Sequence, residues 1–156
     1  MPEISLKFRP ASHHDIPTIV RMLSDDPLGA KREKFETPLP DKYYEAFKFI
    51  RDDPNNELVV ATIDGNIAGF MQITFIPYLT YQGRWRALIE GVRVSRELRN
   101  RGIGKKLFQW AIQRATQRNC HLIQLTSDKK RPDAIKFYKS LGFVPSHEGL
   151  KLHLEL

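Results

Sequence analysis

Apolar and polar residues alternate or recur along this chain at spacings that predict its strands and helices. Near the N-terminus, the apolar residues of 4–8 alternate with polar ones, which predicts a first strand that Pro10 ends. Ser12 and Asp15 stand at capping-box spacing, and apolar residues recur at helical intervals over 16–23. A strand followed by an amphipathic helix is therefore expected at the start of the chain.

The same spacings predict the remaining elements. The dipeptide Asp64-Gly65 separates two apolar runs and is typical of a tight hairpin turn. In chain order we expect a loop or broken helix over 25–40, a helix capped by Asp41, strands over 58–63, 67–76 and 85–94, a helix over 103–118, a strand over 122–125, a helix over 133–141, and two closing strands over 142–144 and 150–156.

This order of elements predicts an α/β fold with one mixed sheet and about four flanking helices. The hairpin-connected strands predict that the sheet is mostly antiparallel. The strand–helix–strand passage from 85 to 125 predicts one parallel, right-handed crossover. The chain has 156 residues and carries neither a repeat nor a linker, so a single domain over 1–156 is expected.

Composition indicates the charge of possible partners and the cellular compartment, but it does not identify a function. Lys and Arg number 25 against 18 Asp and Glu, a formal charge of +7 that favours anionic partners: nucleic acid, acidic lipid and phosphorylated cofactors alike. The single cysteine, Cys120, excludes a disulfide within the chain and points to a reducing compartment. The sequence has neither an apolar run of about 20 residues nor the features of a signal peptide. We therefore expect a soluble, cytoplasmic protein without a membrane partner.

A turn with two glycines lies between the strand over 85–94 and the helix that follows it: Arg99-Asn100-Arg101-Gly102-Ile103-Gly104-Lys105. A glycine turn at a helix start offers free backbone N–H groups and the positive end of the helix dipole, which together bind phosphate. Two glycines do not make a dinucleotide fingerprint, and the spacing is not that of a nucleoside-triphosphate loop. By itself the pattern could equally be a solvated basic loop.

A second motif follows downstream: Asp133-Ala134-Ile135-Lys136-Phe137-Tyr138-Lys139-Ser140-Leu141-Gly142-Phe143. The two motifs together resemble the GCN5-related N-acetyltransferase (GNAT) superfamily over 58–156. The resemblance implies a GNAT-like fold and an enzyme, an acyltransferase that uses acetyl-CoA to acetylate an amine. From Lys129 onward the chain is also similar to aminoalkylphosphonate N-acetyltransferases, which favours a small-molecule amine as the acceptor.

The resemblance implies two groups of cofactor-binding residues. The last residues of the strand before the turn would pair through their backbone with the pantetheine arm, and the turn would hold the diphosphate. These residues are Val92, Arg93 and Val94 in the strand, and Arg99, Asn100, Arg101, Gly102, Ile103, Gly104 and Lys105 in the turn. Lys106 would add charge beside them, and no metal is implied.

Glu90 and Tyr138 are the catalytic candidates. Glu90 matches a position at which many family members carry a base, acting directly or through water; the alternative is a glutamate at a solvent-facing strand edge. Gly91 beside it indicates a bulge that would re-aim the side chain. Tyr138 would protonate the departing thiol; the alternative is a core aromatic. Asp133 stands where many members carry Asn, and we expect it to cap its helix.

Three functions follow for testing. The leading one is an acetyl-CoA-dependent N-acetyltransferase that works by direct transfer to a primary amine in a ternary complex. The second is an acyl-CoA-binding regulator without catalysis, and the third, which the lack of interleaved basic and aromatic residues disfavours, is a nucleic-acid-binding domain. A covalent intermediate on Cys120 is disfavoured because no motif pairs a histidine with it. The sequence does not identify the acceptor amine or the oligomeric state. A homodimer is common in the family that the chain resembles.

Overall fold

The fold was analysed in a computed structural model that describes residues 4–155. It divides into two compact units, one that ends at Gln124 and one that begins at Leu125. The first unit holds a sheet with the strand order β1-β2-β3-β4-β5. Its strands are β1 (Lys7–Pro10), β2 (Asn56–Ile63), β3 (Asn66–Pro77), β4 (Trp85–Val94) and β5 (Cys120–Gln124).

The sheet is antiparallel from β1 to β4, and β5 lies parallel to β4. The mixed sheet and the parallel crossover are therefore confirmed. Asp64 and Gly65, with φ of 50° and 81°, form the predicted turn between β2 and β3. Pro10 is the last residue of β1, which runs over Lys7–Pro10, so the prediction that Pro10 ends the first strand is confirmed. Because β1 is an edge strand, the missing N–H of Pro10 is tolerated there.

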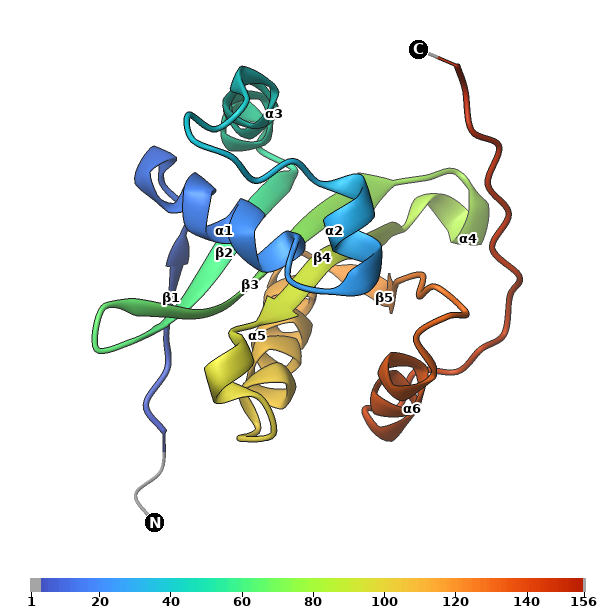
Figure 1. Cartoon of the computed structure of the whole chain (residues 1–156). Helices are drawn as coiled ribbons and strands as arrows, with labels where there is room; N and C mark the ends of the chain where they lie inside the picture. The colour runs from blue at the N-terminus through green and yellow to red at the C-terminus, as the bar shows by residue number, and fades with distance from the viewer. Residues whose placement is uncertain (1–3, 156) are drawn as a thin grey trace. The chain divides into compact units, whose positions relative to one another are not determined.

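Helices cover both faces of this sheet (Figure 1). The helical elements of the first unit are η1 (His13–Asp15), α1 (Ile16–Leu23), α2 (Pro27–Arg32), α3 (Asp41–Asp52), α4 (Thr80–Gly83), η2 (Arg96–Leu98) and α5 (Ile103–Gln117). The region 25–40 holds α2, in agreement with a broken helix. Asp41 is the first residue of α3 rather than its cap, a position that Pro40 occupies.

Two apolar layers hold the helices to the sheet. On one face, α1 and α3 pack on Val60 and Phe70, and this core includes Val20 and Phe47. On the other face, α5 buries its apolar stripe, including Leu107, against β3 and β4. Full burial of one such side chain contributes about 1.5–3 kcal/mol. The position of α5, and with it the turn that precedes it, is therefore fixed by packing.

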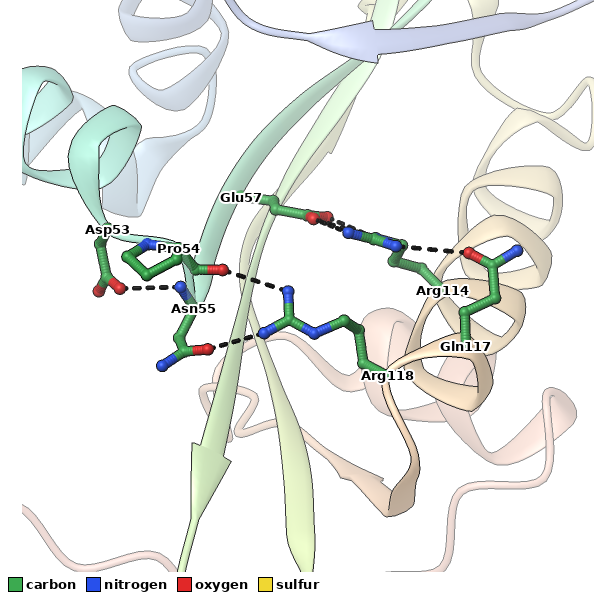
Figure 2. A network of polar contacts seen from close by, with 7 residues as sticks. All are labelled: Asp53, Pro54, Asn55, Glu57, Arg114, Gln117 and Arg118. Carbon is green, nitrogen blue, oxygen red and sulfur yellow. Dashed lines mark hydrogen bonds and ion pairs between the residues drawn. The ribbon is translucent and has the colours of Figure 1, made fainter.

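A polar network anchors the far end of α5 (Figure 2). Arg114 forms an ion pair with Glu57, and this carboxylate raises the pKa of the guanidinium. Arg118 donates to the Asn55 side chain at 2.7 Å and lies 4.2 Å from the centroid of the Phe75 ring. Cation–π and ion-pair contacts thus join the end of the helix to β2 and β3.

The second unit contains α6 (Pro132–Ser140), which confirms the helix predicted over 133–141. The two predicted closing strands are wrong, because no strand is assigned between 125 and 155; Leu156 lies outside the described residues. Leu150 and Leu152 are 93% and 87% exposed. Alternation indicates which side chains share a face, but a strand also needs a neighbour that accepts its backbone hydrogen bonds.

Across residues 4–155, no helix combines the length and the apolar character needed to cross a bilayer.

Candidate functional site

The candidate site of the first unit begins at the turn that joins β4 to α5. β4 ends at Val94, η2 follows, and Gly102 occupies the cap position of α5 with φ of 79°. This left-handed conformation costs little for glycine and about 1–2 kcal/mol for other residues. A Cβ added at Gly102 would meet no atom of the described residues within 4 Å, so the space in front of the turn is open with respect to them.

The first backbone N–H groups of α5 have no acceptor within the described part of the chain. Gly102 has no side chain with which to cap the helix, and the first bond back to the turn runs from Lys106 N to Gly102 O, at 3.1 Å. The N–H groups of Ile103, Gly104 and Lys105 are therefore available to a ligand. They lie at the positive end of a 15-residue helix, where an anion is stabilised.

Positive side chains surround this turn. Arg99, Arg101 and Lys105 are exposed and form no ion pair with any residue between 4 and 155. Lys106 differs from its neighbours, because its Nζ donates to the Ile4 carbonyl at 2.8 Å. This contact orients the ammonium group toward Ile4, and the charge that Lys106 adds beside the turn stays a prediction. Arg99 Nε donates to the Val94 carbonyl at 3.5 Å. Open amides and three cations without a carboxylate partner among the described residues fit the diphosphate of a nucleotide-like cofactor.

β4 carries a bulge immediately before the turn. Glu90 pairs with Gln72 and Arg93 pairs with Phe70, so two residues of β4 face one residue of β3. Gly91, within the bulge, has φ of 63°. The bulge predicted at Gly91 is confirmed, and such a bulge changes the direction of neighbouring side chains.

The other edge of β4 is open along its second half. Its pairing with β5 runs from Trp85 to Leu88, and none of the strands described in the first unit pairs with this edge beyond Leu88. Val92 and Val94 lie on the open part, and the Val92 carbonyl accepts from Arg93 Nη1 at 2.8 Å. An extended ligand can pair with a strand edge of this kind through backbone hydrogen bonds.

Glu90 lies exposed at the start of the bulge, on the sheet face that α1 and α3 partly cover. The connection from α1 to α2 is anchored close by. Leu23 of α1 lies about 4 Å from a Cβ built on Gly91, and Asp25 forms an ion pair of 2.7 Å with Arg96 of η2. The sequence motifs did not indicate this ion pair, because its partners are far apart along the chain.

Tyr138 belongs to the second unit, where it lies on α6. Its ring centroid is 5.6 Å from that of Phe137 and 6.1 Å from that of Phe143. Asp133 is in the first turn of α6, and Arg131 occupies the cap position, so the expectation that Asp133 caps the helix is wrong. Pro132 at the first helical position accounts for the difference, since it sets the helix start one residue before Asp133.

Two further observations concern a covalent intermediate on Cys120 and a metal site. Burial raises the pKa of the Cys120 thiol, which disfavours the thiolate that a covalent mechanism would need. Between residues 4 and 155, no three His, Cys, Asp or Glu side chains come together as a metal site.

A hollow of about 460 Å³ lies at the β1 edge of the sheet, lined by Phe8, Phe47 and Trp110 among others. None of its lining residues belongs to the turn or to β4, so the chemistry considered above does not lie in this hollow.

Comparisons with known proteins point to one family. The model of the acetyltransferase (GNAT) family matches residues 20–143. An aminoalkylphosphonate N-acetyltransferase from Salmonella typhimurium is 30% identical over 95 residues, which is 61% of each chain. An uncharacterized N-acetyltransferase from Archaeoglobus fulgidus is 26% identical and aligns with 86% of this chain and 90% of its own. This chain thus spans about three fifths of the length of the Salmonella relative.

Two solved structures show the same fold. A transcriptional regulator from Bacillus halodurans is 57% identical with a TM-score of 0.93, and the match covers 96% of this chain and 100% of that one. A putative acetyltransferase from Agrobacterium tumefaciens is 25% identical with a TM-score of 0.76, over 95% and 99% of the two chains.

Proposed function

This chain belongs to the acetyltransferase (GNAT) family, and we propose that it transfers the acetyl group of acetyl-CoA to a primary amine of a small molecule. The observation that carries the proposal is the start of α5, where three backbone N–H groups have no acceptor and three cations have no ion-pair partner among the described residues. The name of the Salmonella relative specifies an acceptor that is a small amine, which supports the same class of acceptor here.

The residues around the turn account for cofactor binding in this proposal. The N–H groups of Ile103, Gly104 and Lys105 hold the diphosphate, while Arg99 and Arg101 add charge. The open edge of β4 at 92–94 pairs with the pantetheine arm. Bound in this way, acetyl-CoA supplies a thioester whose carbonyl carbon an amine can attack.

Transfer requires three further groups. A free alkyl amine has a pKa of about 10.4, so a base must take its proton at neutral pH. Glu90 serves as that base, either directly or through a water molecule. A backbone N–H near Val92 stabilises the oxyanion, and Tyr138 protonates the sulfur of coenzyme A as it leaves.

Release of the free thiol during incubation with a panel of amines tests this function. We expect thiol release that depends on both acetyl-CoA and an amine, with the acetylated amine detected by mass spectrometry. Binding of acetyl-CoA without transfer to any amine of the panel would contradict it.

A second candidate is an acyl-CoA-binding regulator that does not catalyse transfer. One observation favours it: the structure that shares 57% identity with this chain is described as a transcriptional regulator. Turnover of acetyl-CoA and binding of DNA distinguish the two functions. A regulator would bind acetyl-CoA without turnover and would bind DNA with an affinity that falls steeply with salt.

A further inference from the structure

The end of α1 closes one side of the bulge in β4. A Cβ built on Gly91 would lie 3.8 Å from Phe70 Cε2 and 4.0 Å from Leu23 Cδ2, which are ordinary van der Waals distances. Phe70 is 1% exposed and belongs to the core, whereas Leu23 is half-buried and is the last residue of α1. A group larger than a methyl group on this side of Gly91 would therefore have to displace Leu23.

Residues 23–29, here called the α1–α2 corner, hold Leu23 in this position. Gly29 of α2 is buried, and a Cβ added to it would lie 1.9 Å from the Leu23 carbonyl oxygen, so α2 packs directly on the end of α1. The Asp26 carboxylate accepts from Gly29 N at 2.9 Å and caps α2. Backbone packed this closely gives the corner little freedom to move by itself.

Two contacts between Asp25 and Arg96, here called the clasp, tie the corner to η2. Arg96 Nη2 lies 2.7 Å from Asp25 Oδ1 and donates to the Asp25 backbone carbonyl at 3.1 Å. The start of η2 is itself fixed to the sheet, because Ser95 N donates to the Ala68 carbonyl of β3 at 2.8 Å. The clasp therefore joins the corner to the segment that lies between the bulge and the turn before α5.

We infer that Leu23 restricts the transferred acyl group to the size of acetyl, and that Arg96 is a positioning residue that holds Leu23 beside the bulge. The inference rests on the proposed function, in which the pantetheine arm pairs with 92–94 and the thioester carbonyl meets an N–H near Val92. The acyl carbons then extend toward Gly91, the preceding residue of β4. Acetyl ends there in a methyl group, whereas a butyryl or hexanoyl chain continues into the space that Leu23 fills.

The length of the acyl chain changes the fit at the bulge but not the reaction. With each acyl group, the amine nitrogen bonds to the thioester carbonyl carbon and the carbon–sulfur bond breaks. The amine gives a proton to Glu90, the departing sulfur takes one from Tyr138, and both residues recover by exchange with water. A difference between acyl-CoA substrates therefore measures the space beside Gly91.

Acetyl-, butyryl- and hexanoyl-CoA test the inference with the best amine of the panel. One extra methylene in a packed site costs about ten- to two-hundredfold in kcat/KM, so the parent protein should prefer acetyl-CoA to butyryl-CoA by about tenfold or more. Leu23→Ala should raise kcat/KM for butyryl-CoA by about tenfold or more and change acetyl-CoA affinity little. Leu23→Val, which removes less volume, should give an intermediate preference. Thermal melting establishes that each variant is folded.

Matched substitutions separate Leu23 and the clasp from general destabilisation. Leu58 is half-buried against the same core as Leu23 but lines the hollow at the β1 edge, so Leu58→Ala should lower Tm and keep the parent preference. Arg96→Gln should weaken the preference for acetyl-CoA about two- to fivefold, as expected for loss of an exposed ion pair. Arg32→Gln, which removes the ion pair with Glu33 at the end of α2, should leave the preference unchanged.

Equal kcat/KM for acetyl- and butyryl-CoA in the parent protein would overturn the inference, as would a Leu23→Ala variant that keeps the parent preference or a Leu58→Ala variant that loses it. An unchanged preference in Arg96→Gln would remove the positioning role of Arg96.

If no amine is acylated, the proposed function fails separately, and calorimetry decides the inference. Acetyl-CoA must then bind more tightly than butyryl-CoA and lose this advantage in Leu23→Ala. Equal binding of the two, or binding of neither, would overturn the inference.

Discussion

Replacement of Gly102 by alanine separates the structural cost of the turn from its role in binding. Gly102 has φ of 79°, and among residues 4–155 a Cβ at this position would meet no atom within 4 Å. Because nothing clashes, the cost to the folded state comes from the left-handed backbone alone, about 1–2 kcal/mol. For a chain of this size, each 1 kcal/mol lowers Tm by about 2–4 °C.

The effect on acetyl-CoA should be larger than this strain. The added methyl group occupies the open space through which phosphate oxygens reach the N–H groups of Ile103 and Gly104. Loss of one hydrogen bond to a charged group costs about 1.5–3 kcal/mol, which weakens the affinity about ten- to a hundredfold. Isothermal calorimetry measures this affinity, and thermal melting measures the strain.

Gly65 provides a matched control within the same chain. It lies in the hairpin between β2 and β3 with φ of 81°, and a Cβ there would also meet no atom of the described part of the chain within 4 Å. Gly65→Ala should lower Tm as much as Gly102→Ala and leave acetyl-CoA affinity unchanged. If both variants melt alike and bind acetyl-CoA with the parent affinity, the turn does not hold the diphosphate.

Three further substitutions test the catalytic assignments and the fold. Tyr138→Phe should lower kcat by about tenfold or more with little change in acetyl-CoA affinity, because the hydroxyl acts only as the thiol leaves; an unchanged kcat would remove Tyr138 from the mechanism. Glu90→Gln should lower kcat about a hundredfold at neutral pH, and the loss should shrink at high pH, where the amine is already neutral; a loss independent of pH would contradict a role as base. Asp15→Asn should destabilise the fold by about 1–2 kcal/mol at neutral pH, since the Arg9 guanidinium holds the pKa of this carboxyl below its usual range. That stabilisation is present above the usual carboxyl pKa of about 3.9 and is lost as the pH falls through the lower folded-state value, so denaturant unfolding that shows the same difference at pH 7 and at strongly acidic pH would refute it.

Local rules predicted the parts of the fold in which nearby residues determine the conformation. The hairpin at Asp64-Gly65, the bulge at Gly91 and the glycine turn before α5 each depend on the backbone freedom of a few residues, which the sequence displays directly. The catalytic and cofactor-binding residues came from the resemblance to a family, and their roles are still predictions.

The features that the sequence did not predict depend on partners far apart in the chain. The ion pair of Asp25 with Arg96 joins residues 71 positions apart. Lys106 Nζ donates to the Ile4 carbonyl, a contact between residues 102 positions apart that no sequence motif indicated. In the same way, the alternating leucines after 149 predicted a strand because periodicity carries no information about a neighbouring strand.

A crystal structure of the chain with coenzyme A bound would show directly whether the start of α5 binds the diphosphate. The proposed function requires diphosphate oxygens about 2.7–3.2 Å from the backbone nitrogens of Ile103, Gly104 or Lys105. A well-ordered cofactor with its diphosphate bound at any other place on the chain would contradict it.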